Sequence, residues 1–158
     1  MVYHLDSKSI PKIVGFEKNI NTVSVFRDFL FKNESVNVFT IRDSLFNMTA
    51  IFLAELKNDI IKKLCYFETP MIDSNSNKIR LVAFQTQEIS KEKNYKFFNE
   101  CVEYIFSNCL ESKISLSTDV INENLFRFYG FDLEVLYPEN SFYDNKIYEL
   151  AIYKMISK

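Results

Sequence analysis

The stretch KIRLVAFQT, residues Lys78–Thr86, decides the fold together with the residues that follow it. It is the best candidate for a strand in the chain. After a polar connection, the segment Glu92–Asn108 predicts an amphipathic helix, because its apolar residues recur at intervals of three and four positions and form one stripe. The stripe consists of Phe98, Cys101, Val102, Ile105, Phe106 and Cys109. A strand, a short bend and such a helix form the first half of a βαβ unit, in which we expect Leu81, Ala83 and the stripe to bury one another.

The length of 158 residues predicts a single domain with a substantial core. Hydrophobic residues make up 47% and charged residues 25%, as in ordinary globular proteins. Glycine is scarce, since only Gly15 and Gly130 occur. Phosphate-binding loops usually need glycine, because their backbone must approach the ligand closely. The composition therefore argues against an ordinary phosphate loop.

The charge and the cysteines narrow the class of protein further. A net charge of −2 argues against a general nucleic-acid binder, and no apolar run has the length of a membrane span. The first residues lack a signal-peptide pattern. Cys65, Cys101 and Cys109 have no metal-ligand spacing, so we expect reduced, mostly buried thiols, no metal and a cytoplasmic location. Cys101 and Cys109 lie about 12 Å apart along the predicted helix, too far for a disulfide.

The segments before the central strand predict helices first and then a strand meander. A short strand is expected at Val2–Leu5, and a helix capped by Ser9 is expected to run to about Lys18. Asn21 and Thr22 are expected to cap a second helix, Val23–Lys32. Strands are then predicted at Val36–Arg42, Thr49–Leu56 and Ile60–Phe67, with turns at Asp43–Asn47, Lys57–Asp59 and Asp73–Asn77. Thr49–Leu56 also suits a helix, but the turn and returning strand that follow favour a hairpin.

The segments after the central helix predict a second parallel strand and a closing hairpin. Lys113–Thr118 alternates in polarity, as a half-buried strand does. Asn122–Phe128 is expected to be a short helix that ends at Gly130 in a left-handed conformation. The last elements are expected to be strands at Phe131–Tyr137 and Lys146–Ile156, with a long turn from Pro138 to Asn145.

This order of elements resembles the GCN5-related N-acetyltransferase family over nearly the whole chain. The most specific piece is Ile114–Phe131, where a strand precedes a short helix that carries Leu125-Phe126 and then Tyr129-Gly130-Phe131. The resemblance implies an α+β fold with a mixed, mostly antiparallel central sheet and flanking helices. It also implies a V-shaped opening between the parallel strands Ile79–Thr86 and Lys113–Thr118.

The resemblance further implies an acyl-CoA-dependent N-acyltransferase with acetyl-CoA or another acyl-CoA as cofactor. The backbone of Phe84, Gln85 and Thr86 is then expected to bind the pantetheine arm, and the amides of this strand to polarise the thioester carbonyl. The acceptor is expected to be a small-molecule or protein amine, with no nucleic acid or membrane partner. A homodimer is compatible with this expectation.

The cofactor loop departs from the family pattern, which is Arg or Gln, two residues, Gly, one residue, and then Gly or Ala. The placements Gln87–Ser90–Glu92 and Lys91–Asn94–Lys96 both lack glycine. We therefore expect Ser90, Lys91, Lys93 and Asn94 to contact the cofactor instead, with the two lysines supplying charge to the phosphates.

The general acid of the family also differs. Aligned on Gly130, the tyrosine that many members use to protonate the departing thiolate is Phe126, which has no proton to give. Tyr129 is the candidate to replace it, and Glu88 is the candidate base, because it follows the central strand where open sheets present ligands. Three alternatives remain: a catalytically inactive binding or regulatory module of the same fold, an enzyme resembling acyl-homoserine-lactone synthases, and a different α+β domain. The second is a weaker match, because their N-terminal motif is not evident.

Overall fold

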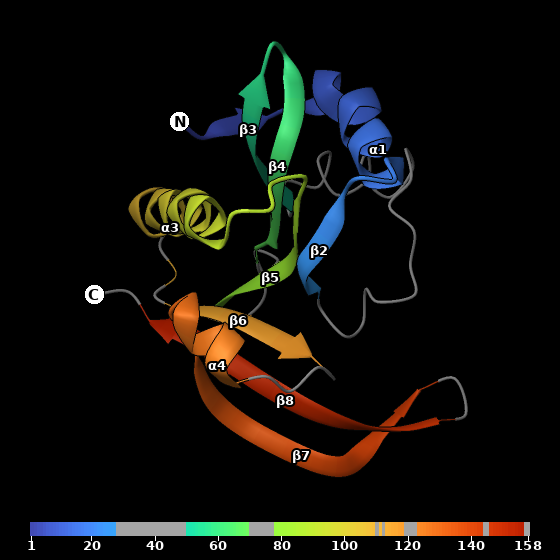
Figure 1. Cartoon of the computed structure of the whole chain (residues 1–158). Helices are drawn as coiled ribbons and strands as arrows, with labels where there is room; N and C mark the ends of the chain where they lie inside the picture. Colours follow the sequence, from blue (N-terminus) through green and yellow to red (C-terminus); the bar gives the residue numbers. More distant parts are fainter. Residues whose placement is uncertain are drawn as a thin grey trace.

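The structure is a computed structural model that describes residues 1–27, 50–69, 78–109, 111, 113–118, 123–143 and 146–156. Within these ranges, eight strands form a single sheet in the order β1-β3-β4-β5-β6-β8-β7, with β2 paired to β5 beside this path. The elements are β1 (Tyr3–Leu5), a 3₁₀ turn (Ser7–Ser9), α1 (Ile10–Lys18), β2 (Val23–Arg27), β3 (Ala50–Lys57), β4 (Ile60–Glu68), β5 (Lys78–Thr86), α3 (Lys91–Asn108), β6 (Lys113–Thr118), α4 (Glu123–Phe128), β7 (Asp132–Tyr143) and β8 (Lys146–Ile156) (Figure 1).

The predicted fold class is confirmed, because a mixed and mostly antiparallel sheet carries helices on its faces (Figure 1). Among the pairs of described strands, β5 and β6 run parallel, and the other pairs run antiparallel. The predicted hairpin between β3 and β4 is also confirmed. Its turn residues Asn58 and Asp59 have φ angles of 53° and 63°, the left-handed values that a tight hairpin turn requires.

The two faces of the sheet bury separate hydrophobic clusters. On the face of α3, the helix inserts a stripe against β4 and β5 that includes Phe97, Phe98, Cys101, Val102 and Ile105. On the other face, α1 buries Ile10, Ile13 and Phe16 against β3 and β4. The helical stripe was thus predicted correctly in its centre, whereas Phe106 and Cys109 are only partly buried. No helix of the described residues is long and apolar enough to cross a membrane.

The predicted helix at Val23–Lys32 is wrong over its first five residues. These residues form β2, which pairs antiparallel with β5 and has a register shift between Ser24 and Phe26. The β-branched Val23 and Val25 favour a strand, and the edge of β5 supplies backbone partners that the local sequence does not reveal. The remaining residues of that helix, the predicted strand Val36–Arg42, and the turns Asp43–Asn47 and Asp73–Asn77 lie outside the described residues.

The closing hairpin is longer than predicted. Residues 138–143, which were expected to form a turn, continue β7 as far as Tyr143 opposite β8. The register shifts between Tyr137 and Ser141, the interval that contains Pro138. Because proline cannot donate a ladder hydrogen bond, it is tolerated in strands at such irregular positions.

Candidate functional site

The site is built where the parallel strands β5 and β6 separate. The two strands pair only at Lys78–Arg80 and Lys113–Ser115, although β5 continues to Thr86. The predicted opening between them therefore begins after Arg80. Along the second half of β5, β4 pairs with one edge of the strand. The other edge continues the edge that pairs with β6 in the first part of β5.

Strand β2 occupies that opposite edge. Val23 pairs with Thr86, Ser24 with Gln85 and Phe26 with Phe84. The backbone of Phe84–Thr86, which was expected to bind the pantetheine arm, thus has a neighbouring strand on both sides. Figure 1 shows β2 beside the end of β5, on the side towards which β6 diverges.

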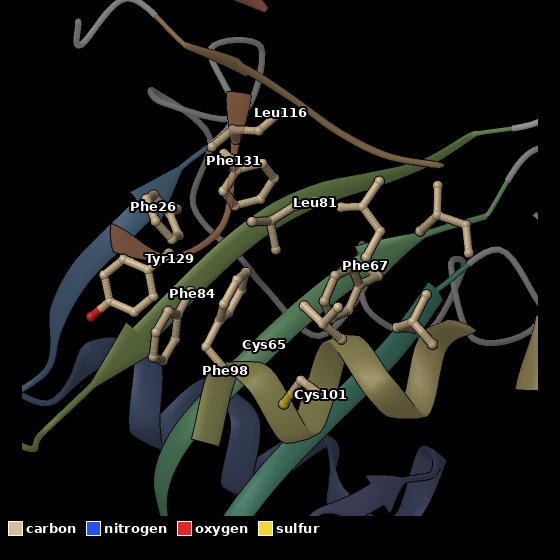
Figure 2. Close-up of a cluster of buried hydrophobic side chains, with 14 of the residues drawn as sticks. Phe26, Cys65, Phe67, Leu81, Phe84, Phe98, Cys101, Leu116, Tyr129 and Phe131 are labelled. Atoms are coloured by element: carbon tan, nitrogen blue, oxygen red, sulfur yellow. The ribbon is translucent and has the colours of Figure 1, made fainter. Parts of the chain in front are cut away.

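An aromatic cluster fills the core beside β2 and is shown in Figure 2. Its centre is Phe26, which is 2% exposed. The ring centroids of its neighbours lie 5.0–6.3 Å away, and the neighbours come from β5, α3 and the segment that follows β6: Phe84, Phe98, Phe126, Tyr129 and Phe131. Aromatic pairs at such distances contribute about 0.5–1.5 kcal/mol each beyond their burial. Phe26 is therefore the main anchor of β2.

Phe126, which the alignment on Gly130 predicts at the position of the family's tyrosine, is a core residue. It is 2% exposed and stacks on Tyr153 with a centroid distance of 4.0 Å. Phe126 is buried because it lies on the side of α4 that faces the sheet, where it packs against Tyr153 of β8. A proton donor would have to come from another residue, and Tyr129 is the nearest candidate in sequence.

Tyr129 lies between the aromatic cluster and a groove. Its ring packs edge to face on Phe98, while its hydroxyl points away from the labelled cluster in Figure 2. Burial, and secondarily the nearby Cys65, raise the pKa of the Tyr129 hydroxyl. The groove has a volume of about 670 Å³ and runs between α3 and the β7–β8 hairpin, lined in part by Tyr95, Asn99, Glu103, Tyr129, Asp132 and Lys154.

Gly130 explains why the chain turns at this place. Its φ angle of +93° is in the left-handed region, where a side chain is rarely accepted. The amide of Gly130 donates to the carbonyl of Arg127, and that of Phe131 donates to the carbonyl of Phe126. This predicted left-handed stop is confirmed, and it sets Tyr129 at the end of α4.

The connection between β5 and α3 is held by its own side chains. The Thr86 hydroxyl donates to Oδ1 of Asn94 at 2.8 Å and accepts from the amide of Glu88 at 2.9 Å. Nδ2 of Asn94 donates to the carbonyl of Glu88 at 3.0 Å. Thr86 is 1% and Asn94 5% exposed. The side chains of these two predicted cofactor residues are thus engaged in fixing the loop.

The beginning of α3 carries a side-chain cap and acidic residues. Oγ of Ser90 accepts from the amide of Lys93 at 3.4 Å, and the amide of Ser90 donates to a carboxylate oxygen of Glu88 at 3.1 Å. The carboxylate of Glu92 accepts from the Ser90 hydroxyl at 3.3 Å. Carboxylates are favourable at a helix N-terminus, but they also repel a phosphate there.

The two predicted phosphate lysines extend from the first turn of α3. Nζ of Lys93 lies 4.0 Å from the Glu88 carboxylate, and its side chain is 71% exposed. Nζ of Lys91 lies 4.0 Å from the centroid of the Phe128 ring, a cation–π contact between α3 and α4. The structure therefore brings Glu88, Ser90, Lys91 and Lys93 together around one helix end.

Sequence reasoning missed Phe26 and the role of β2. The available signal was the strand preference of the β-branched Val23 and Val25, but the segment was predicted as a helix that begins at Val23. It also missed Phe97, which is 2% exposed in the first half of α3.

Comparisons with known proteins agree with this geometry at the level of the fold. Neither a protein-family sequence model nor a curated protein sequence matches the chain. Solved structures match over almost the entire length. A ribosomal-protein-alanine N-acetyltransferase from Brucella melitensis has a TM-score of 0.71 at 10% identity and covers 99% of each chain.

Two further solved structures are similar. An N-acetyltransferase from Staphylococcus aureus Mu50 has a TM-score of 0.71 at 14% identity, covering 99% of this chain and 96% of that chain. A spermidine N-acetyltransferase chimera from Vibrio cholerae and hSSAT has a TM-score of 0.70 at 13% identity, covering 99% and 94%. Similarity of this kind shows that the chain has the fold of GCN5-related N-acetyltransferases in a divergent form.

Proposed function

We propose that this chain, which has the fold of GCN5-related N-acetyltransferases, is an acyl-CoA-dependent N-acyltransferase that acts on an amine. The observation that carries the proposal is the separation of the parallel strands β5 and β6 after Arg80, with α3 starting shortly after the end of β5. The acceptors named for similar structures, ribosomal-protein alanine and spermidine, are amines, which supports the same class of acceptor here.

The cofactor is proposed to bind along the second half of β5. The backbone of Phe84, Gln85 and Thr86 would hydrogen-bond the pantetheine arm, and the amides of this strand would polarise the thioester carbonyl. Ser90 and Asn94 shape the loop, and Lys91 and Lys93 supply the positive charge near the phosphates. Because Glu88 and Glu92 lie at the same helix end, the net attraction for a phosphate is weak, and we expect weak acyl-CoA binding.

The chemistry is proposed to be a direct attack of the amine on the thioester. The nitrogen forms the new amide bond while the carbon–sulfur bond breaks. The proton of the amine goes to Glu88, and the hydroxyl of Tyr129 protonates the departing thiolate. The raised pKa keeps this hydroxyl protonated at neutral pH, so it is in the donor form that a general acid needs, although the same shift makes it a weaker acid.

A transfer assay tests this proposal. Purified protein is incubated with acetyl-CoA and with spermidine or a peptide that begins with alanine, and the acceptor is followed by mass spectrometry. We expect acetylated acceptor to accumulate in proportion to the protein, and Tyr129→Phe to lower the rate. No transfer to either acceptor, together with no heat of acetyl-CoA binding at millimolar ligand, contradicts the proposal.

A catalytically inactive binding module of the same fold is the second candidate. The observation that favours it is the occupation of both edges of Phe84–Thr86 by strands, since this leaves the pantetheine without a free edge unless β2 moves. The buried Phe126, at the position where the family resemblance predicts a tyrosine, also favours an inactive module. An acetyl-CoA titration separates the two candidates, because the inactive module is expected not to bind it.

A further inference from the structure

Strand β2 closes the edge on which the proposed cofactor would lie. Residues Ala83–Thr86 have β4 on one edge and β2 on the other. The first part of β5 has β6 on that second edge instead. Strand β2 therefore fills the wedge that opens where β6 leaves β5, and its pairing uses the backbone groups that an extended ligand would need.

We infer that β2 is a displaceable internal strand that keeps the acyl-CoA site closed and leaves the edge of β5 when the cofactor binds. This inference rests on the proposed function, because it concerns regulation of the same site. Pantetheine is an extended chain that carries amide groups. It can therefore add to a strand edge in the manner of a β-strand and compete with β2 for the same backbone groups.

The pairing of β2 has the features of a strand that can be exchanged. It is five residues long, and a register shift interrupts its ladder between Ser24 and Phe26. Val23 is 57% exposed, so the first residue of the strand contributes little burial. A short strand with an interrupted ladder has few backbone hydrogen bonds to break when it leaves a sheet, so the burial of Phe26 is the main term that opposes its release.

Ring packing, an ion pair and a side-chain hydrogen bond hold β2 in place. Phe26 is buried among the aromatic rings of β5, α3 and the α4 segment. The guanidinium of Arg27 lies 3.3 Å from the Glu17 carboxylate of α1. Just before the strand, the Thr22 hydroxyl accepts from Nε2 of Gln87 at 3.1 Å. The last contact links the residue just before β2 to the loop that is proposed to hold the phosphates.

The position of Phe26 connects the closing strand β2 to Tyr129, the proposed general acid. Its ring meets Tyr129 edge to face, with centroids 5.0 Å apart. Withdrawal of β2 therefore frees the β5 edge and uncovers the ring of the proposed general acid in one movement. A protein that must open before it binds has its apparent affinity reduced by the fraction of open molecules. Weakening β2 should thus tighten acyl-CoA binding.

Two variants and one control test the inference. Phe26→Ala removes the anchor, and Ser24→Pro weakens the pairing at an exposed residue, because proline fixes φ and removes a backbone donor. Phe16→Ala is the control, since Phe16 is 5% exposed and belongs to the cluster on the other face of the sheet. It introduces a similar truncation in a hydrophobic cluster to which no residue of β2 belongs.

Calorimetry with acetyl-CoA is carried out on the four proteins after circular dichroism has confirmed that they are folded. We expect Phe26→Ala and Ser24→Pro to bind at least tenfold more tightly than the unmodified protein, and Phe16→Ala to bind like it. Equal affinities in all four proteins overturn the inference and leave the proposed function standing. An absence of binding in all four overturns both.

Hydrogen exchange on the unmodified protein provides a second measurement that needs no variant. The amides of residues 23–27 are compared with and without saturating acetyl-CoA. We expect the cofactor to accelerate their exchange, since β2 loses its partner. Unchanged or slower exchange of residues 23–27 with bound cofactor shows that β2 stays in place and overturns the inference.

Discussion

Phe26 of β2 and Tyr129 at the end of α4 meet edge to face, with ring centroids 5.0 Å apart and an interplanar angle of 80°. The two residues are far apart in the sequence, and they join the strand that closes the β5 edge to the proposed general acid. The structure thus places a core contact where the family resemblance predicts a reaction centre.

The first prediction concerns Tyr129. Replacement by Phe should lower the transfer rate about 100-fold or more if its hydroxyl is the general acid. Burial and Cys65 raise its pKa, so on the alkaline side the rate of the unmodified protein should begin to fall only above the pH at which an ordinary phenol ionises. Tyr95→Phe is the matched control, since Tyr95 lines the same groove. Equal rates for the Tyr129→Phe variant and the unmodified protein would remove Tyr129 from the mechanism.

The second prediction concerns Glu88. Glu88→Gln keeps an oxygen that can accept from the Ser90 amide but removes the charge and the base. We expect the transfer rate to fall, because no carboxylate accepts the proton, and acetyl-CoA to bind several-fold more tightly, because a repulsive charge is lost. Glu103→Gln is a control on the outer part of α3. A lower rate without tighter binding would separate Glu88 from the phosphates, whereas an unchanged rate would exclude it as the base.

The third prediction concerns Lys91 and Lys93. Each charged contact to a phosphate contributes on the order of 1 kcal/mol or more, so replacing both lysines with Ala should weaken acyl-CoA binding roughly tenfold. Added salt should reproduce part of this loss in the unmodified protein. Lys12→Ala/Lys18→Ala on α1 is a charge-matched control. If the double variant at Lys91 and Lys93 binds as tightly as the unmodified protein, the phosphates are held elsewhere.

The fourth prediction uses the only two glycines of the chain. Gly130→Ala should destabilise the protein by about 1–2 kcal/mol, because its φ of +93° disfavours a side chain and the new Cβ would lie 3.3 Å from Cε of Met155. Gly15→Ala in α1 should stabilise it by about 0.5–1 kcal/mol, because no heavy atom lies within 4 Å of the added Cβ. Urea denaturation measures both changes, and the same sign for the two variants would contradict the expectation.

The fifth prediction concerns the thiols. Cys65 and Cys101 are fully buried, whereas Cys109 is partly exposed. Burial, followed by the neighbouring Cys101, raises the pKa of the Cys65 thiol well above its usual value. A thiol reagent at pH 8 should therefore modify Cys109 first, and all three cysteines after denaturation without reductant. Fewer than three reactive thiols in the denatured protein would disprove the expected reduced state.

Local patterns in the sequence predicted most of the fold but not the environment of the site. The bounds of β5 and α3 were predicted almost correctly. The apolar pattern of Lys78–Thr86 and the helical spacing that follows it are local signals, formed by residues close together in the sequence. Strand β2 was missed, because the spacing of Val23 and Phe26 suits one face of a helix, and the strand preference of the β-branched Val23 and Val25 was given less weight. Its partner Thr86 is distant in sequence.

The loop residues show a second limit of sequence reasoning. The family resemblance pointed to Ser90, Lys91, Lys93 and Asn94 as cofactor residues near a helix start, and the structure does gather them at the beginning of α3. The sequence could not reveal that the Asn94 side chain is buried and hydrogen-bonded to the Thr86 side chain. A polar residue that hydrogen-bonds a buried group of the protein cannot be distinguished in a sequence from one that binds a ligand.

Amide chemical shifts recorded during an acetyl-CoA titration test the central claim most directly. The account predicts saturable shift changes that are concentrated at Phe84–Thr86, in the loop up to Asn94, and in β2. Binding that perturbs only residues elsewhere would place the cofactor outside the opening between β5 and β6. The absence of any change at millimolar acetyl-CoA would contradict the acyltransferase proposal itself.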